Sequence, residues 1–275
     1  MLKKSSLASV VTIAGSYPCG GAGIQADIKA ISATGAYAAS VITVLVAQNT
    51  CHVTAIQEIP LCFIQQQIDA VFSDLAIGAV KLGMLYQEEI IHLLVNNLKK
   101  YQPPFIVLDP VIITQTDHLL SKPQTINALI NALFHLATLI TPNIPEAETI
   151  LKSPINDFNS LRDAAITLAK QYKISVLLKG GHLKSVDSPD IFYDYPQQQI
   201  HCFNTPRINT QNTHGTGCTL SSAIASYLAQ GEDLYHAIAK AKHYLSQAIV
   251  AAKNLKLGRG NGPVHHFYFL AKETP

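Results

Sequence analysis

The chain has 275 residues, of which 14% are charged and 48% are hydrophobic. This composition is typical of a globular protein and excludes a disordered chain, which would carry more charge and fewer apolar residues. The 20 Lys and Arg residues nearly balance the 18 Asp and Glu residues, and there is no Trp. A nucleic-acid partner or a basic membrane-binding surface is therefore not expected.

The N-terminus and the cysteines bear on the cellular compartment. Lys3 and Lys4 precede an apolar stretch, as in a signal peptide, but residues 10–13 fit a first buried strand equally well. The five cysteines are odd in number and lack C-x-x-C spacing, which argues against a disulfide framework and a zinc site. The longest run without charged or strongly polar residues, 36–47, is shorter than the roughly 18 residues of a membrane helix. We expect a cytoplasmic protein without membrane spans.

Apolar, β-branched runs alternate with helical patterns along the whole chain. Strands are expected at residues 10–14, 40–47, 77–83, 105–109, 136–141, 176–179 and 190–195, and helices at 24–34, 62–73, 87–100, 123–134, 160–171, 218–230 and 234–253. This alternation predicts βαβ units around a mostly parallel sheet. Because no repeat or long linker interrupts it, residues 1–275 are expected to form a single domain.

Polar or glycine-rich segments follow the expected strands one after another. They are residues 15–23, 48–50, 83–84, 109–112, 141–148 and 179–182. In an open parallel sheet, ligands bind beyond the carboxyl ends of the strands. The six segments are therefore expected to build one site at one edge of the sheet.

The segment NTHGTGCTLSSAIAS, residues 212–226, predicts a helix that starts at a glycine-rich turn. The first amides of such a helix have no internal partner, so Gly215, Thr216, Gly217 and Cys218 could form an anion hole that suits a phosphate. The helix terminus would lower the pKa of the Cys218 thiol and make it a base or nucleophile. Alternatively, the glycines only cap a tightly packed helix and Cys218 is a small buried apolar residue.

Three charged residues at strand ends could act on the same phosphate. Asp109 and Glu146 could hold Mg²⁺ through water, because this ion keeps much of its hydration shell beside phosphates. Lys179 could supply positive charge. Taken singly, each has an ordinary explanation: a loop-capping Asp, a Glu matched to a helix dipole, and a solvent-facing Lys.

A second glycine-rich turn, residues 20–27, follows the first expected strand and ends at Asp27, a possible partner for a ligand N–H or hydroxyl. It lacks the GxGxxG spacing of a dinucleotide site. The chain also has no GxxxxGK[ST] segment, which excludes a P-loop.

These segments together resemble those of a known family. AGSYPCGGAGIQADIKA, SVITVLVAQNT, VKLGML, LDPVI, TPNIPEAE, LLKGGH and NTHGTGCTLSSAIA occur in the order and spacing of the ribokinase-like vitamin kinases, and within them of the hydroxymethylpyrimidine/phosphomethylpyrimidine kinases of thiamine biosynthesis. The resemblance covers about residues 10–267 without an insertion. It implies an α/β fold, a ribokinase-like three-layer α/β/α sandwich with a central, mostly parallel sheet.

The resemblance also implies a role for each candidate residue. The expected substrates are 4-amino-5-hydroxymethyl-2-methylpyrimidine and its monophosphate, phosphorylated with ATP and Mg²⁺ by a homodimer. Cys218 would take the proton from the substrate, and residues 215–218 would stabilise the transferring phosphoryl group. Lys179 would face the ATP phosphates, and Asp109 and Glu146 would hold Mg²⁺ through water. The residues expected around the pyrimidine are Gly15, Asp27, Gln48, Met84 and Val111, with Asp27 and Gln48 as its hydrogen-bond partners.

The chain departs from the family pattern at the first glycine-rich loop, where Tyr17 and Cys19 replace the usual Asp and Ser. We expect Tyr17 to be tolerated because the loop backbone shapes the pocket. A second departure lies near the C-terminus, where Arg259 and Asn261 differ from the family pattern but the glycines of the turn are retained. Two other functions stay open: a pyridoxine or pyridoxal kinase of the same fold, and a catalytically silent ligand-binding protein.

Overall fold

The computed structural model describes residues 7–112 and 123–270. These residues form a nine-stranded sheet in the order β3-β2-β1-β4-β5-β6-β7-β8-β9. The strands are β1 (Ser9–Ser16), β2 (Tyr37–Gln48), β3 (Val53–Glu58), β4 (Ala79–Leu82), β5 (Ile106–Leu108), β6 (Leu139–Ile140), β7 (Ser175–Lys179), β8 (Asp190–Asp194) and β9 (Gln199–Phe203). The six strands from β2 to β7 in this order are parallel, and β3, β8 and β9 are antiparallel additions at the two edges.

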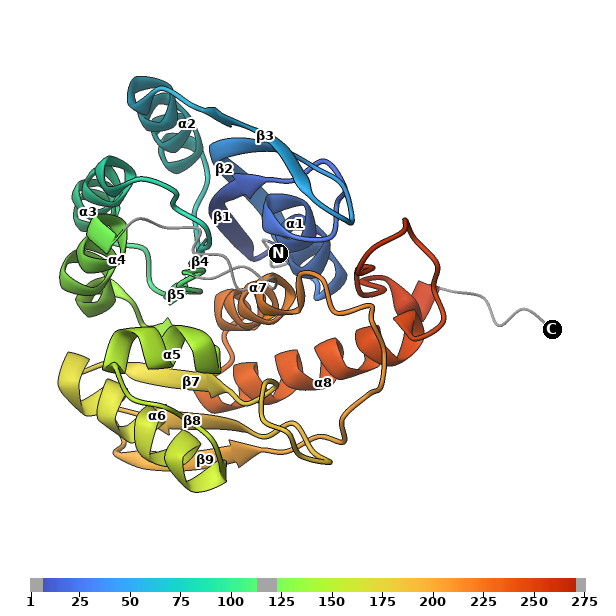
Figure 1. Cartoon of the computed structure of the whole chain (residues 1–275). Coiled ribbons are helices and arrows are strands. Elements are labelled where there is room, and N and C mark those ends of the chain that lie inside the picture. Colours follow the sequence, from blue (N-terminus) through green and yellow to red (C-terminus); the bar gives the residue numbers. More distant parts are fainter. Residues whose placement is uncertain (1–6, 113–122, 271–275) are drawn as a thin grey trace, which may run out of the picture.

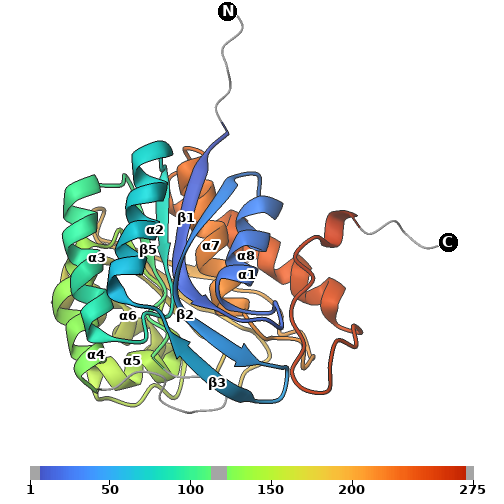
Figure 2. The same cartoon turned by 90° about the horizontal axis from the view of Figure 1, so that it is seen from above.

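Helices cover both faces of the sheet (Figures 1 and 2). They are α1 (Gly23–Ala33), α2 (Leu61–Asp74), α3 (Glu88–Tyr101), α4 (Pro123–Ala128), α5 (Ile144–Leu151), α6 (Phe158–Tyr172), α7 (Thr216–Ala229) and α8 (Leu234–Ala252), with the short turns η1 (Leu129–Leu133), η2 (Phe134–Leu136) and η3 (Tyr268–Leu270). Helices α1, α7 and α8 pack on one face, and α2 to α6 on the other. The expected three-layer α/β/α sandwich is confirmed.

The two layers are separated by the alternation of side chains along each strand. In β7, Val176 and Leu178 enter the core beneath α2 to α6, whereas Leu177 enters the core beneath α1, α7 and α8. Successive strand residues point to opposite faces, and a strand covered on both faces is apolar at nearly every position. This is why the inner strands were recognisable as continuous apolar runs.

Two strands and one helix were not predicted. Strands β3 and β9 lie at the edges of the sheet, and β3 is exposed along its whole length, so neither has an apolar run. Helix α5 was expected only as a helix start. Its N-terminus is fixed by a capping box in which Asn143 accepts from the Glu146 amide and Glu146 accepts from the Asn143 amide. No helix in the described ranges is both long and apolar enough to cross a bilayer.

Candidate functional site

A cavity of about 680 Å³ lies at the carboxyl ends of the parallel strands. All six polar segments expected at this edge contribute to its lining, through Tyr17, Gln48, Met84, Asp109, Glu146 and Lys179 among others. The start of α7 completes the wall with Gly215, Thr216, Gly217 and Cys218. The prediction that these distant segments build one site is therefore confirmed.

The two glycine-rich turns are pressed against each other. Gly215 caps α7 in the left-handed region, with φ 77°, and a Cβ at this position would lie 1.8 Å from the Gly21 carbonyl oxygen. Glycine is required there both by conformation and by space. The Thr216 amide closes the turn by donating to the Thr213 carbonyl at 3.3 Å. The amides of Gly217 and Cys218 follow it at the positive end of α7.

Lys179 and Asp109 lie next to the first turn of α7. Lys179 Nζ donates to Asp109 Oδ1 at 2.9 Å, and Thr141 donates to the same oxygen at 3.2 Å. A Cβ on Gly217 would lie 3.2 Å from Lys179 Nζ and 3.3 Å from Asp109 Oδ2. The predicted cation, carboxylate and glycine turn therefore meet in one place.

Glu146 is buried at 3% exposure, and its carboxylate accepts from the Asn143 amide at 2.8 Å and from the Ile112 amide at 3.3 Å. Burial, and secondarily the charge of Asp109, raises its pKa to about 7 against the attraction of Lys179. Two buried carboxylates beside one lysine leave an excess of negative charge. A hydrated divalent cation fits this excess, although no group of three or more metal-binding side chains occurs among the described residues.

An apolar cluster forms the wall beside Cys218. It consists of Val44, Val46 and Met84, with Tyr17, Tyr86 and Val111 packed against them. The Tyr17 hydroxyl donates to the Met84 sulfur at 2.8 Å, and its ring lies where a Cβ on Gly23 would approach to 2.2 Å. The expectation that only the loop backbone shapes the pocket is thus wrong, because the Tyr17 side chain is part of the wall.

Val111 and Gln48 both reach this end of the cavity. Val111 has φ 39°, a left-handed conformation that is strained for a β-branched residue and is found mainly at functional sites. Gln48 is half-buried at the end of β2. Gln48 lines the cavity, and no described residue forms a hydrogen bond with its side-chain amide.

Gly15 and Asp27 are not among the residues that line the cavity. Gly15 is buried in β1, where a Cβ would press to within 3.0 Å of Val44 and 3.1 Å of Met84. The structure gives Asp27 a different role from the expected hydrogen bond with the pyrimidine. Oδ1 accepts from Lys81 and Ser222, and Oδ2 accepts from Lys81 and Thr12, so all four acceptor positions of the carboxylate are in use.

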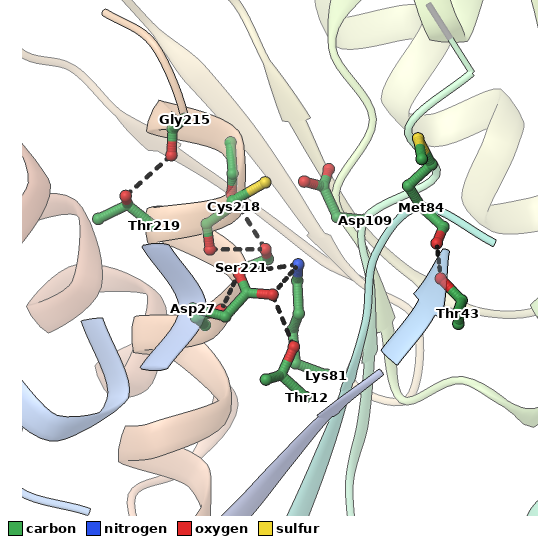
Figure 3. A network of polar contacts seen from close by, with 12 residues as sticks. Thr12, Asp27, Thr43, Lys81, Met84, Asp109, Gly215, Cys218, Thr219 and Ser221 are labelled. Atoms are coloured by element: carbon green, nitrogen blue, oxygen red, sulfur yellow. Dashed lines mark hydrogen bonds and ion pairs between the residues drawn. The ribbon is translucent and has the colours of Figure 1, made fainter. Parts of the chain in front are cut away.

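Cys218 lies in the first turns of α7, near Lys81 and Asp109 (Figure 3), and its ionisation differs from expectation. The helix terminus was predicted to lower the pKa of its thiol, but burial dominates and raises that pKa to about 11. The charge of Lys81 and a hydrogen bond from the Gly23 amide oppose the rise, whereas Asp27 and Asp109 add to it. The fixed partial charge of a helix end is smaller than the cost of burying an anion, so the neutral thiol predominates at pH 7.

Lys81 was missed in the sequence. It is fully buried in β4, lines the cavity and pairs with Asp27 at 2.9 Å. A lysine in the middle of the apolar run AVKLG is the signal that could have revealed it, because lysines are almost never buried unless paired.

Comparison with known proteins identifies the family to which the chain belongs. The model of the phosphomethylpyrimidine kinase family matches residues 18–265. A thiamine biosynthesis bifunctional protein of Geobacter sulfurreducens is 48% identical over 94% of this chain, which spans only 52% of that relative. The hydroxymethylpyrimidine/phosphomethylpyrimidine kinase of Salmonella typhimurium is 42% identical over 94% of this chain and 97% of the relative.

Solved structures agree with this result. The crystal structure of phosphomethylpyrimidine kinase from Clostridium difficile is 42% identical, with a TM-score of 0.78 over 88% of this chain and 99% of that one. An ADP complex of Bacillus subtilis pyridoxal kinase is 31% identical, with a TM-score of 0.89 over 97% of this chain and 100% of that one.

Proposed function

The chain belongs to the phosphomethylpyrimidine kinase family, and we propose that it phosphorylates 4-amino-5-hydroxymethyl-2-methylpyrimidine with ATP in thiamine biosynthesis, first to the monophosphate and then to the diphosphate. The observation that carries this proposal is the position of Cys218. It shares one cavity with the apolar wall and with the Lys179–Asp109 pair. A flat ring with a hydroxymethyl arm and a chain of phosphates would place their reacting atoms at this sulfur.

The apolar wall suits the pyrimidine ring. Met84 and Val111 supply its faces, and the Met84 carbonyl is fixed by a hydrogen bond from Thr43 at 2.9 Å. The Gln48 amide can both donate and accept, which matches the alternating donor and acceptor groups of an aminopyrimidine. We place Gly15 behind this wall and Asp27 beneath it, as supports and not as contacts of the ring.

The phosphate end is formed by Lys179, Asp109 and Glu146 with the first amides of α7. Lys179 would exchange its bond to Asp109 for one to the ATP phosphates, since it keeps 15% of its side chain exposed. Asp109 and Glu146 would hold hydrated Mg²⁺, which neutralises phosphate charge when bound. The nucleotide complexes among the solved relatives support ATP as the phosphoryl donor.

The chemical step needs little covalent participation by the protein, because phosphoryl transfer depends mainly on positioning and charge stabilisation. The Cys218 thiolate would accept the proton of the substrate hydroxyl as its oxygen bonds to the γ-phosphorus of ATP and ADP departs. The amides of Gly215, Gly217 and Cys218, together with Lys179, would stabilise the negative charge on the transferring group, whereas the Thr216 amide is held by the Thr213 carbonyl.

A coupled ATP assay on the pyrimidine, its monophosphate and pyridoxal tests the proposal. We expect turnover of both pyrimidines to exceed that of pyridoxal. Gln48→Ala should raise KM for the pyrimidine about ten- to a hundredfold, since an unpaired buried ligand group costs about 1–3 kcal/mol. Dominant turnover of pyridoxal would favour the alternative function of a pyridoxal kinase. Pyridoxal kinases of solved structure are 30–31% identical to this chain. Failure to hydrolyse ATP with any of the three would indicate a silent binding protein.

A homodimer and a cytoplasmic location stay predictions. Leu45, Val53 and Ile56 of the β2–β3 hairpin are large apolar side chains that are 43–46% exposed, and this edge of the sheet would suit a second copy of the chain. Sedimentation of the purified protein would test the dimer.

A further inference from the structure

The pair formed by Lys81 and Asp27 is sealed inside the protein and held from several sides. Both side chains have no exposed surface, and Lys81 Nζ lies 2.9 Å from each oxygen of Asp27. Thr12 from β1 donates to Asp27 at 2.6 Å, and Ser222 from α7 donates to it at 2.8 Å. A carboxylate with every acceptor position filled has no capacity left for a substrate, so its role is to fix the lysine.

The helix geometry brings this pair next to Cys218. Residues four apart share one face of a helix, so Cys218 lies one turn above Ser222, the residue that reaches Asp27. Lys81 and Cys218 both line the cavity. In Figure 3, the Lys81 ammonium group points toward the first turns of α7, which carry Cys218.

Charged groups from four elements face the thiol. Lys81 of β4 lowers its pKa, and Asp27 of α1 and Asp109 at the end of β5 raise it. Lys179 of β7 is a second cation that interacts with Cys218, and Tyr17 lies close as a neutral phenol whose own pKa is raised by burial. Among the charges acting on the thiol, that of Lys81 is the largest. Because neither side chain of the pair has exposed surface, water screens its charge less than it would at the protein surface.

We propose that Lys81 is a positioning residue that stabilises the thiolate of Cys218 and so determines how much of the base is ready before phosphoryl transfer. The inference rests on the proposed function of Cys218 and adds the group on which its ionisation depends. The thiol first releases its proton to water. The thiolate then accepts the proton of the substrate hydroxyl while its oxygen bonds to the γ-phosphorus of ATP and the bond from that phosphorus to the bridging oxygen breaks, which releases ADP. Lys81 keeps its own proton throughout.

The experiment compares the two halves of the pair, because they should act in opposite directions. Cys218 is alkylated with iodoacetamide between pH 7 and 9.5, and its labelled peptide is quantified by mass spectrometry in the wild type, Lys81→Met and Asp27→Asn. A rise of one pH unit in the thiol pKa lowers the thiolate fraction about tenfold but makes it about threefold more nucleophilic, a net loss of about threefold. We expect alkylation about threefold slower or more in Lys81→Met and about threefold faster in Asp27→Asn.

A merely structural role predicts a different result. Both substitutions break the same buried ion pair, so loosening of the fold would change the alkylation rate in the same direction in both. Equal directions, or no change in either, would overturn the proposal. If Lys81→Met does not yield folded protein, Asp27→Asn decides alone, since faster alkylation supports the role of Lys81 and unchanged or slower alkylation contradicts it.

Two further variants serve as controls. Lys242→Met breaks a second buried ion pair, with Asp190, that is not among the groups acting on Cys218, so its alkylation rate should equal that of the wild type. Lys81→Arg keeps the positive charge and should restore most of the rate lost in Lys81→Met. The assay contains neither ATP nor pyrimidine. Its outcome is therefore separate from that of the kinase assay.

Discussion

Two lysine–aspartate pairs lie beside the start of α7, and they have the same chemistry and the same 2.9 Å separation. Lys81 and Asp27 are completely buried and their carboxylate is saturated with donors. Lys179 retains 15% exposure, and Asp109 lines the cavity beside Glu146. The comparison teaches that burial, and not the type of residue, separates a fixed charge from a pair that can exchange partners with a ligand.

The largest expected effect concerns Cys218, on which both pairs act. Cys218→Ala should lower kcat by about 10²–10⁴-fold, the usual contribution of a general base, while ATP and pyrimidine binding stay near normal. Steady-state kinetics with calorimetric binding would measure both quantities. Unchanged turnover would mean that the thiol only packs the site, and the comparison of the two pairs would then concern stability alone.

Breaking the buried Lys81–Asp27 pair should cause the largest loss of stability. Lys81→Met leaves Asp27 buried without its counter-ion, and removing one partner of a buried ion pair lowers the free energy of unfolding by about 3–5 kcal/mol. Urea titration would measure the loss. The double variant Asp27→Asn/Lys81→Met should recover part of it, because no uncompensated charge stays in the core. If Lys81→Met leaves the free energy of unfolding unchanged, the difference in burial between the two pairs has no consequence for stability.

The Lys179–Asp109 pair should show the reverse pattern, with a large effect on turnover and a smaller effect on stability. Lys179→Met should lower kcat by about 10²–10³-fold, comparable to the loss of a donor that stabilises transition-state charge. Its loss of unfolding free energy should be smaller than that of Lys81→Met, because Asp109 keeps its bond from Thr141 and lines the cavity, whereas Asp27 does not. A loss of stability as large as that of Lys81→Met would contradict the assignment of Lys179 to an exchangeable pair.

The smallest effect is a pH dependence of stability that comes from Glu146, which lies beside the Lys179–Asp109 pair. The pKa of Glu146 is raised from 4.5 to about 7, so the unfolded chain gives up this proton at lower pH than the folded protein. The contribution of Glu146 to stability is therefore lost as pH rises through this interval, by about 2 kcal/mol between pH 5 and 8. Glu146→Gln should flatten this part of the stability profile.

The carboxyl-end loops illustrate what could be predicted. Each lies after an apolar strand, and parallel strands bring such loops to one edge whatever their separation in the chain. Asp109, Glu146 and Lys179 could thus be assigned to one site from the sequence, whereas the resemblance to the family was needed to add Cys218. The edge strands β3 and β9 could not be predicted, because half-exposed strands lack the apolar runs that mark the buried ones.

The sequence by itself determined the fold class, the family and the strand-end segments that meet at the cavity. Only the tertiary structure decided what those residues are free to do. Asp27 follows a glycine-rich turn and looks available to a ligand, yet Lys81, Thr12 and Ser222 occupy all its acceptor positions. Cys218 begins a helix, yet burial raises the pKa of its thiol. The physical reason is common to both. Hydrogen-bond saturation and desolvation depend on contacts between residues as far apart in the chain as 27 and 222, and local sequence patterns do not contain that information.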